Sequence, residues 1–125
     1  MKRGTVYNRL YTPELWEQVN SENKELLDDF LIELKAQKKK ESTITQYYYD
    51  GRYILIYILK ELNNKSILEL KKKQFRNMTL YFSDKGVSNA RVNRLMSFVR
   101  SMLNFAEDDD DYDYDHDYDN SPYIP

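Results

Sequence analysis

Hydrogen-bonding and cationic side chains gather on one side of a predicted helix over residues 87–106. With successive residues about 100° apart, this side lies opposite the apolar positions and carries no acid before Glu107. Its members are Asn93, Arg94, Ser97, Arg100, Ser101 and Asn104. Arginine and asparagine bind phosphates and base edges, so the face suits a polyanion, and a duplex groove is the leading candidate. A solvated helix that happens to be basic explains the same pattern equally well.

The charge of the chain is divided between two regions. All 19 Lys and Arg residues precede Glu107, whereas nine of the 21 acids lie in residues 107–119, and the whole chain carries −2. Residues 1–41 balance eight basic residues against eight acids, so the excess of +7 over residues 1–106 belongs to residues 42–106. This localisation favours an anionic partner for the later helices.

Side chains suited to metal binding or catalysis are few. The sequence has no cysteine, which excludes disulfides and thiolate metal sites, and its one histidine is His116. Asp111, Asp113 and Asp115 have the spacing of a calcium loop, but His116 replaces its glycine and Pro122 its glutamate. A linker, or a strand that mimics DNA charge, fits this segment better. We therefore expect no cofactor and no metal.

The elements that must position these residues are predicted to be helices. Three glycines and three prolines, beside 41% apolar and 32% charged residues, favour one all-α domain. Thr12 caps a short helix with Pro13 at its first position, and Ser21 begins a second, longer helix. The 3.6-residue period predicts further helices over residues 43–62, 72–85 and 88–106, with residues 65–70 as a connector that plugs the core.

Three positions define how these helices begin, end and pack. Gly86 supplies a left-handed stop, and Ser88 is a good N-cap for the last helix. Gly51 lies at the centre of the predicted buried face of the helix over residues 43–62. Because glycine has no side chain, another helix can approach closely there.

Both ends of the chain are expected to lie outside the helical domain. Residues 1–11 show no period and predict an extended arm, and residues 107–125 alternate Asp with Tyr, which predicts a disordered acidic tail. The helical domain then covers residues 12–106. No signal peptide and no stretch of about 20 apolar residues is present, so we expect a cytoplasmic protein without membrane association.

The order of these elements resembles the N-terminal core-binding domain of phage integrases in the tyrosine recombinase family. The resemblance covers roughly residues 20–122. It rests on Ser42-Thr43-Ile44…Tyr47, on the connector at residues 64–70, and on the Arg94…Ser97-Phe98-Val99-Arg100 series. The opening Tyr7-Asn8-Arg9-Leu10-Tyr11-Thr12 is similar to integrases of bacterial mobile elements.

The resemblance implies a SAM-like bundle of four to five helices that forms half of a clamp around double-stranded DNA. The helices matching residues 43–62 and 88–106 would cross the major groove. The family's contacts carry over to Ser42, Gln46 and Tyr49 in the first helix and to Asn89, Asn93, Arg94, Ser97 and Arg100 in the second. Thr43, Thr45, Arg52 and Ser88, on the same two stretches, complete the candidate set. Tyr49 and Tyr53 replace residues that are commonly basic in the family.

The family cleaves DNA with a separate catalytic domain, whose His-x-x-Arg constellation the lone His116 cannot form. We therefore expect a non-catalytic, monomeric DNA-binding domain that meets other integrase protomers in the full-length protein. A helical protein-interaction module is the first alternative. A helix-turn-helix regulator, with its turn at Gly86, is the second. An enzyme that acts alone is the least favoured interpretation.

Overall fold

The computed structural model describes residues 10–109, which form an all-α bundle of five α-helices and one 3-10 turn. The elements are α2 (Pro13–Gln18), α3 (Ser21–Ala36), α4 (Glu41–Glu61), η1 (Ile67–Glu69), α5 (Lys72–Asp84) and α6 (Asn89–Asp108). The predicted all-α class is confirmed. Residues 1–9 of the expected arm and residues 110–125 of the expected tail, with the calcium-like spacing and His116, lie outside the described residues.

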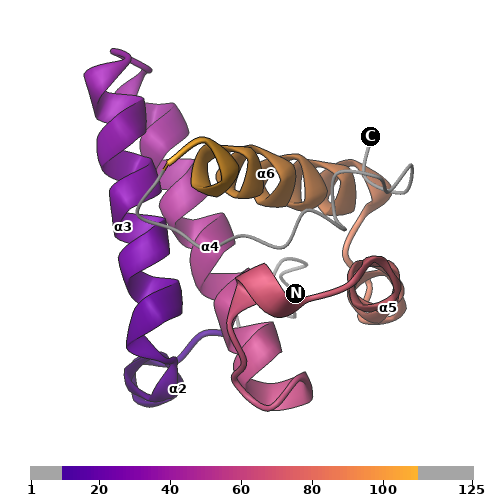
Figure 1. Cartoon of the computed structure of the whole chain (residues 1–125). Coiled ribbons are helices and arrows are strands. Elements are labelled where there is room, and N and C mark those ends of the chain that lie inside the picture. The colour runs from indigo at the N-terminus through magenta and orange to yellow at the C-terminus, as the bar shows by residue number, and fades with distance from the viewer. Residues whose placement is uncertain (1–9, 110–125) are drawn as a thin grey trace.

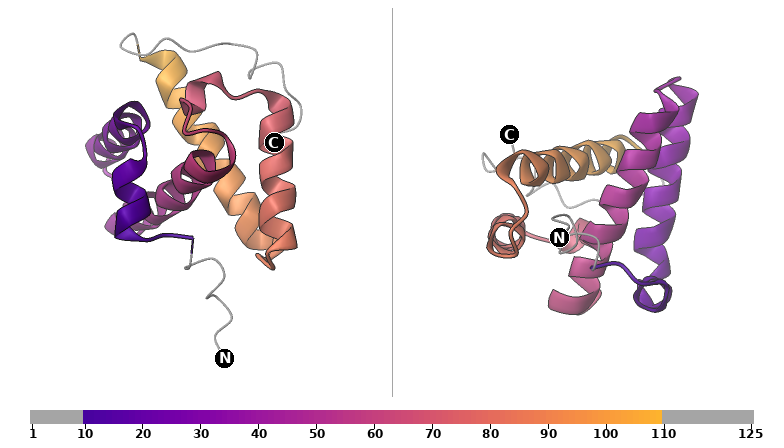
Figure 2. Two further views of the ribbon diagram at one scale, coloured as in Figure 1. Left: turned by 90° about the horizontal axis from the view of Figure 1, so that it is seen from below. Right: turned by 180° about the vertical axis from the view of Figure 1, so that it is seen from behind.

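Two long helices, α3 and α4, run side by side in opposite directions and form one half of the bundle (Figure 1). Helix α6 crosses this pair and contacts both of its members, and α5 packs on α6 at the side away from α3 (Figure 2). Helix α2 packs against α4 near the start of α3. This arrangement makes α4 the central element of the fold.

The predicted caps are confirmed. The Oγ1 atom of Thr12 and the Oγ atom of Ser88 each accept a hydrogen bond from a backbone N–H three residues later, at 3.1 and 3.2 Å. These bonds satisfy amides at the starts of α2 and α6 that have no partner within the helix. Gly86 has a φ of 93°, the left-handed conformation that ends α5 with little strain.

The predicted close approach at Gly51 is also confirmed. A Cβ atom placed there would lie 2.7 Å from Cδ1 of Leu27 in α3 and 3.2 Å from Cζ of Phe98 in α6. Both neighbouring side chains are fully buried. Only glycine lets the three helices meet at this distance without displacing a core side chain.

Residues 53–58 of α4 are buried on every side, which the periodicity did not predict. A 3.6-residue period places Ile56 on the outward side of the helix, with Tyr49 and Arg52, yet its exposed fraction is 0%, and Tyr53 is only 6% exposed. The prediction is wrong here because neighbours pack around this half of α4 from several directions. Helices α2 and α3 contact α4, and the ring of Tyr57 lies 4.8 Å from Tyr81 and 5.8 Å from Phe82 in α5.

The apolar face of α6 is buried as predicted, and one further residue joins it. Phe98 is 0% exposed and lies 6.0 Å from the ring of Phe30 and 5.5 Å from that of Tyr47. In α5, a 3.6-residue period places Thr79 on the buried side with Phe75, Met78 and Phe82, but Thr79 is only half-buried. The confirmed members of the α6 face are Val92, Leu95, Met96, Val99, Met102, Leu103 and Ala106.

A buried asparagine attaches the connector after α4 to the start of α3. The Asn23 side chain is 0% exposed; its Nδ2 donates to the carbonyl of Lys65 at 3.0 Å, and its Oδ1 accepts from the amide of Ile67 at 2.9 Å. The apolar residues of this connector, Ile67, Leu68 and Leu70, are buried as expected. The chain that follows α4 is thus fastened to the start of α3.

Candidate nucleic-acid interface

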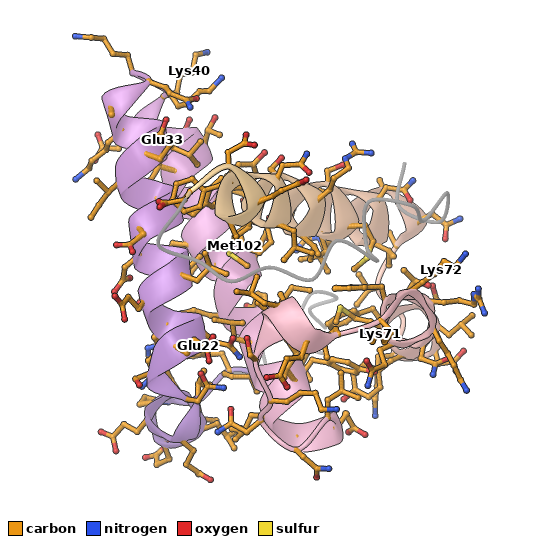
Figure 3. The ribbon with its side chains drawn as sticks, viewed as in Figure 1. Glu22, Glu33, Lys40, Lys71, Lys72 and Met102 are labelled. Carbon is orange, nitrogen blue, oxygen red and sulfur yellow. The ribbon has the colours of Figure 1, made fainter. Side chains whose placement is uncertain are left out.

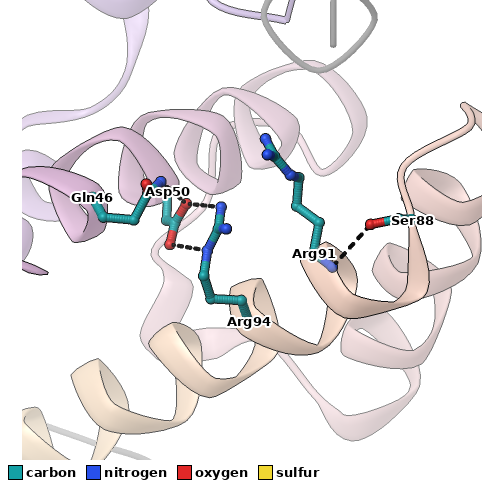
Figure 4. Close-up of polar contacts among 5 residues, drawn as sticks. All are labelled: Gln46, Asp50, Ser88, Arg91 and Arg94. Carbon is teal, nitrogen blue, oxygen red and sulfur yellow. Dashed lines mark hydrogen bonds and ion pairs between the residues drawn. The ribbon is translucent and has the colours of Figure 1, made fainter. Parts of the chain in front are cut away.

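An ion pair joins α4 to α6 at the edge of the candidate DNA face (Figure 4). Nη2 of Arg94 lies 3.0 Å from Oδ1 of Asp50, and Nε of Arg94 lies 3.3 Å from Oδ2. Nε2 of Gln46, one turn before Asp50, donates to Oδ1 at 3.1 Å. The carboxylate therefore receives donors from both helices.

The two partners of this pair differ in their access to solvent. The Asp50 side chain is 0% exposed, whereas that of Arg94 is 34% exposed. A buried carboxylate is costly unless a cation and hydrogen bonds compensate for its lost hydration, and Arg94 and Gln46 supply both. The two-atom contact also holds the guanidinium in one orientation.

The α4 candidates lie on its first half, where one side of the helix reaches solvent. Ser42 and Thr45 are exposed, Tyr49 is 42% exposed, and Gln46 is partly exposed beside the ion pair. Thr43 is also partly exposed, but it turns toward a groove between α3 and α6.

The α6 candidates also reach solvent. Asn89 and Asn93 are exposed, and Ser97 and Arg100 are partly exposed. Ser88 is exposed, although its hydroxyl caps the helix. The structure thus brings Gln46 and Arg94 into contact with one carboxylate, while the remaining α6 candidates lie on the side of the helix away from its buried face.

Arg52 is positioned differently from the other candidates. Its Cζ atom lies 3.5 Å from the ring centre of Tyr11, 4.9 Å from that of Tyr49 and 5.1 Å from that of Tyr48. Its Nε atom is buried without a hydrogen-bond partner among the described residues. Stacking on tyrosine faces stabilises a guanidinium, so Arg52 attaches Tyr11 to α4.

Two residues of this region were not in the candidate set. Arg91 lies one turn before Arg94 and extends from α6 on the side that faces α4 (Figure 4). Its spacing of three from Arg94 was a usable signal. Asp50 is four residues after Gln46, which predicts a local contact, but its partner Arg94 is 44 residues away, and no local pattern predicts that pairing.

The two lysine clusters lie apart from each other. Lys40, at the turn between α3 and α4, and Lys72, at the start of α5, extend from opposite ends of the molecule (Figure 3). Lys40 belongs to residues 1–41, so of these two clusters only the one at the start of α5 contributes to the +7 of residues 42–106. Within the described part of the chain, no group of three or more acidic or histidine side chains is placed to hold a metal ion. No helix there combines the length and apolar character needed to cross a membrane.

A groove of about 770 Å³ lies between α3, the start of α4 and the end of α6. Aromatic rings and acids line it, among them Phe30, Tyr47, Phe105, Glu33 and Asp108. Carboxylates repel phosphate, so this groove does not suit nucleic acid and marks a limit of the candidate interface.

Comparison with known proteins gives one significant match. No protein-family model matches the chain, and no solved structure matches it significantly. The chain is 27% identical over 97 residues to the SPbeta prophage-derived recombinase-like protein YomM of Bacillus subtilis (strain 168). This chain is similar to a recombinase-like protein. The match takes in 78% of this chain and 28% of that protein, so the chain spans less than a third of the length of this relative.

Proposed function

We propose that this helical domain binds double-stranded DNA as the core-binding domain of a tyrosine recombinase. In this proposal, α4 and α6 lie along the major groove and hold the recombination site. The recombinase-like relative supports a role in recombination, and the resemblance of the helix order to phage integrases supports the finer assignment.

The observation that carries the proposal is the junction of α4 and α6 through Asp50. Gln46 and Arg94 come from helices far apart in the sequence, yet both donate to one carboxylate. All twelve candidate residues are at least partly exposed, which a DNA-contacting surface requires.

In the expected mechanism, different side chains supply the affinity for DNA and the recognition of its sequence. Lys and Arg side chains bind phosphates and release condensed counterions, which supplies most of the affinity. Gln46, Asn93 and Arg94 have the donors and acceptors that read base edges in the major groove. This domain forms only half of the clamp, so we expect it to bind weakly by itself.

We further propose that this domain does not cleave DNA. A tyrosine nucleophile needs a lowered phenol pKa or an adjacent base. Burial instead raises the pKa of Tyr53, Tyr57 and Tyr81, and the charge of Glu61 raises the pKa of the last two further. These environments oppose formation of the phenolate.

A salt titration tests DNA binding. Fluorescence anisotropy with a labelled duplex should give an affinity that falls steeply between about 50 mM and 200 mM NaCl, because bound phosphates release counterions. Arg100→Gln should lower the slope of log K against log salt by about one, since one cation is lost from the interface. Lys72→Gln removes the same charge from α5, a helix that carries none of the candidate residues, and should leave the slope unchanged. A salt-independent affinity would contradict the proposal.

The acidic groove favours a second candidate, a module that binds a basic peptide segment. The aromatic side chains that line this groove offer apolar contact to such a partner. Its carboxylates are complementary to the positive charge of the peptide. Mapping of backbone amide shifts separates the two functions. Added duplex DNA should shift amides in residues 42–52 and 88–100 if the domain binds DNA. The protein-interaction module predicts no shift there.

A further inference from the structure

We infer that Asp50 determines which DNA sequences the α4–α6 surface prefers, because it fixes the positions of Gln46 and Arg94. Asp50 is then a positioning residue, since it is buried beneath the surface and acts through its two donors. The inference rests on the proposed DNA-binding function and specifies how that site distinguishes one duplex from another.

The contact geometry favours recognition of bases over attachment to phosphates. Arg94 meets Asp50 through Nε and Nη2, so its side chain is held at two points while a third of its surface remains exposed. Gln46 is held by the same carboxylate through Nε2. Side chains fixed by a second layer of hydrogen bonds present their donors in one geometry, which reading a base edge requires.

The opposite charges of Asp50 and Arg94 also favour recognition of bases over attachment to phosphates. The negative charge of Asp50 largely cancels that of Arg94 at a separation of 3.0 Å, so the pair offers little net attraction to the phosphate backbone. Arg100 forms no ion pair with a carboxylate of residues 10–109 and is partly exposed, which suits a phosphate contact. Two of the three arginines of α6 thus have different roles: Arg94 contributes selectivity, and Arg100 contributes affinity.

The carboxylate itself is held rigidly. Asp50 precedes Gly51, where α3, α4 and α6 approach so closely that a Cβ atom would overlap Leu27. A shift of α4 relative to α6 would break this packing, so the Asp50 carboxylate stays in line with Arg94. The close packing at Gly51 and the ion pair at Asp50 together form one rigid junction beneath the proposed interface.

Asp50→Asn in the full chain tests the inference. Selection from random duplexes first identifies a sequence that the wild-type protein prefers, and affinity is then measured for this duplex and for a shuffled one. We expect the variant to bind the shuffled duplex as tightly as the wild type or more tightly, because a negative charge is lost. The ratio of the two affinities should fall roughly tenfold, since an amide NH2 group replaces one carboxylate oxygen and Arg94 can no longer be held through both Nε and Nη2.

Asp84→Asn is the matched control. Asp84 is an exposed acid at the end of α5, so its replacement removes the same charge without touching Gln46 or Arg94. The control should keep the wild-type ratio. An unchanged ratio in Asp50→Asn would overturn the inference even though DNA is bound. Absence of binding to every duplex by the wild type would overturn the proposed function instead.

Arg94→Lys covers the case in which Asp50→Asn does not fold. Lysine keeps the positive charge opposite Asp50 but cannot contact both carboxylate oxygens in the planar two-point geometry. We expect Arg94→Lys to bind the shuffled duplex like the wild type and to lose the same discrimination. Retained discrimination would show that fixed geometry at this junction does not set the sequence preference.

Discussion

Arg94 illustrates how one side chain can serve the fold and a binding surface together. It neutralises a carboxylate that is completely removed from solvent while a third of its own surface stays exposed. Removal of a partner from such a pair leaves an uncompensated charge, whereas removal of both charges does not. The stability of the domain should therefore depend on Arg94 whether or not DNA is bound.

Arg94→Ala should lower the free energy of unfolding by about 3 kcal/mol, the low end for buried pairs because Arg94 is partly exposed. Urea denaturation followed by circular dichroism measures this loss. The double variant Asp50→Asn/Arg94→Met should recover most of it, since no unpaired charge remains. Arg100→Ala, outside the pair, should change stability by no more than about 0.5 kcal/mol. Equal losses in Arg94→Ala and Arg100→Ala would contradict a stabilising role for the pair.

This dependence also affects how DNA-binding data are interpreted. Loss of binding in Arg94→Ala can arise from an unfolded domain as well as from a lost base contact. Variants that keep the ion pair, such as Arg94→Lys, separate the two causes.

At the scale of elements, helix boundaries follow from local chemistry and burial follows from neighbours. Thr12, Gly86 and Ser88 mark helix ends through their own side chains or backbone freedom, so the sequence predicts these ends well. The outward side of α4 could be predicted only where no other helix covers it. Ile56 is buried because elements from elsewhere in the chain pack there, and a 3.6-residue period carries no information about them.

In the candidate site, too, local features could be predicted from the sequence and long-range contacts could not. Gln46, Arg94 and Arg100 were predicted because each lies on the polar side of its own helix. Asp50 was missed because its role depends on a contact across 44 residues of sequence. Long-range pairings of this kind require the fold to be known.

The packing of α4 against α5 predicts that the free energy of unfolding depends on pH. Burial, and then the charge of Glu61, raises the pKa of Tyr57 and Tyr81 above 10.0. In the unfolded chain these phenols ionise near pH 10. The unfolded state therefore loses protons first, so the free energy of unfolding should fall as pH rises above about 10, until the folded-state pKa values are reached.

Denaturant titrations between about pH 8 and pH 11 measure this decline. Tyr57→Phe should make it shallower, because one perturbed phenol is removed. Glu61→Gln is the companion variant, since it removes a charge that raises the pKa of both phenols, and it should also make the decline shallower. If Tyr57→Phe declined as steeply as the wild type, burial of this phenol would not contribute to the linkage.

At the scale of the whole molecule, charge is separated along the chain. The +7 of residues 42–106 is followed by six aspartates within residues 110–119. Exposed charges act on one another within a Debye length, about 10 Å at 0.1 M salt and longer at lower salt. An acidic segment tethered to a basic domain should therefore compete with DNA most strongly at low salt.

Truncation after Asp109 changes the formal charge from −2 to +4, because six aspartates are removed. We expect the truncated chain to bind a duplex several-fold more tightly at low salt, and the difference to shrink as ionic strength rises. A full-length chain with these six aspartates changed to asparagine should behave like the truncated one. Equal affinities of all three chains at low salt would assign the segment no electrostatic role.

The two halves of α4 are under different constraints, with a consequence for how new specificities arise. Residues 54–58 are enclosed on all sides, so almost any replacement there disturbs packing. Ser42 and Thr45 are exposed, and Tyr49 is 42% exposed beside Arg52 and Tyr48, so these side chains can be exchanged at less cost to folding. Diversification can therefore proceed at these outward positions while the enclosed half preserves the scaffold. A library randomised at these three positions alone is the natural starting point for retargeting the domain.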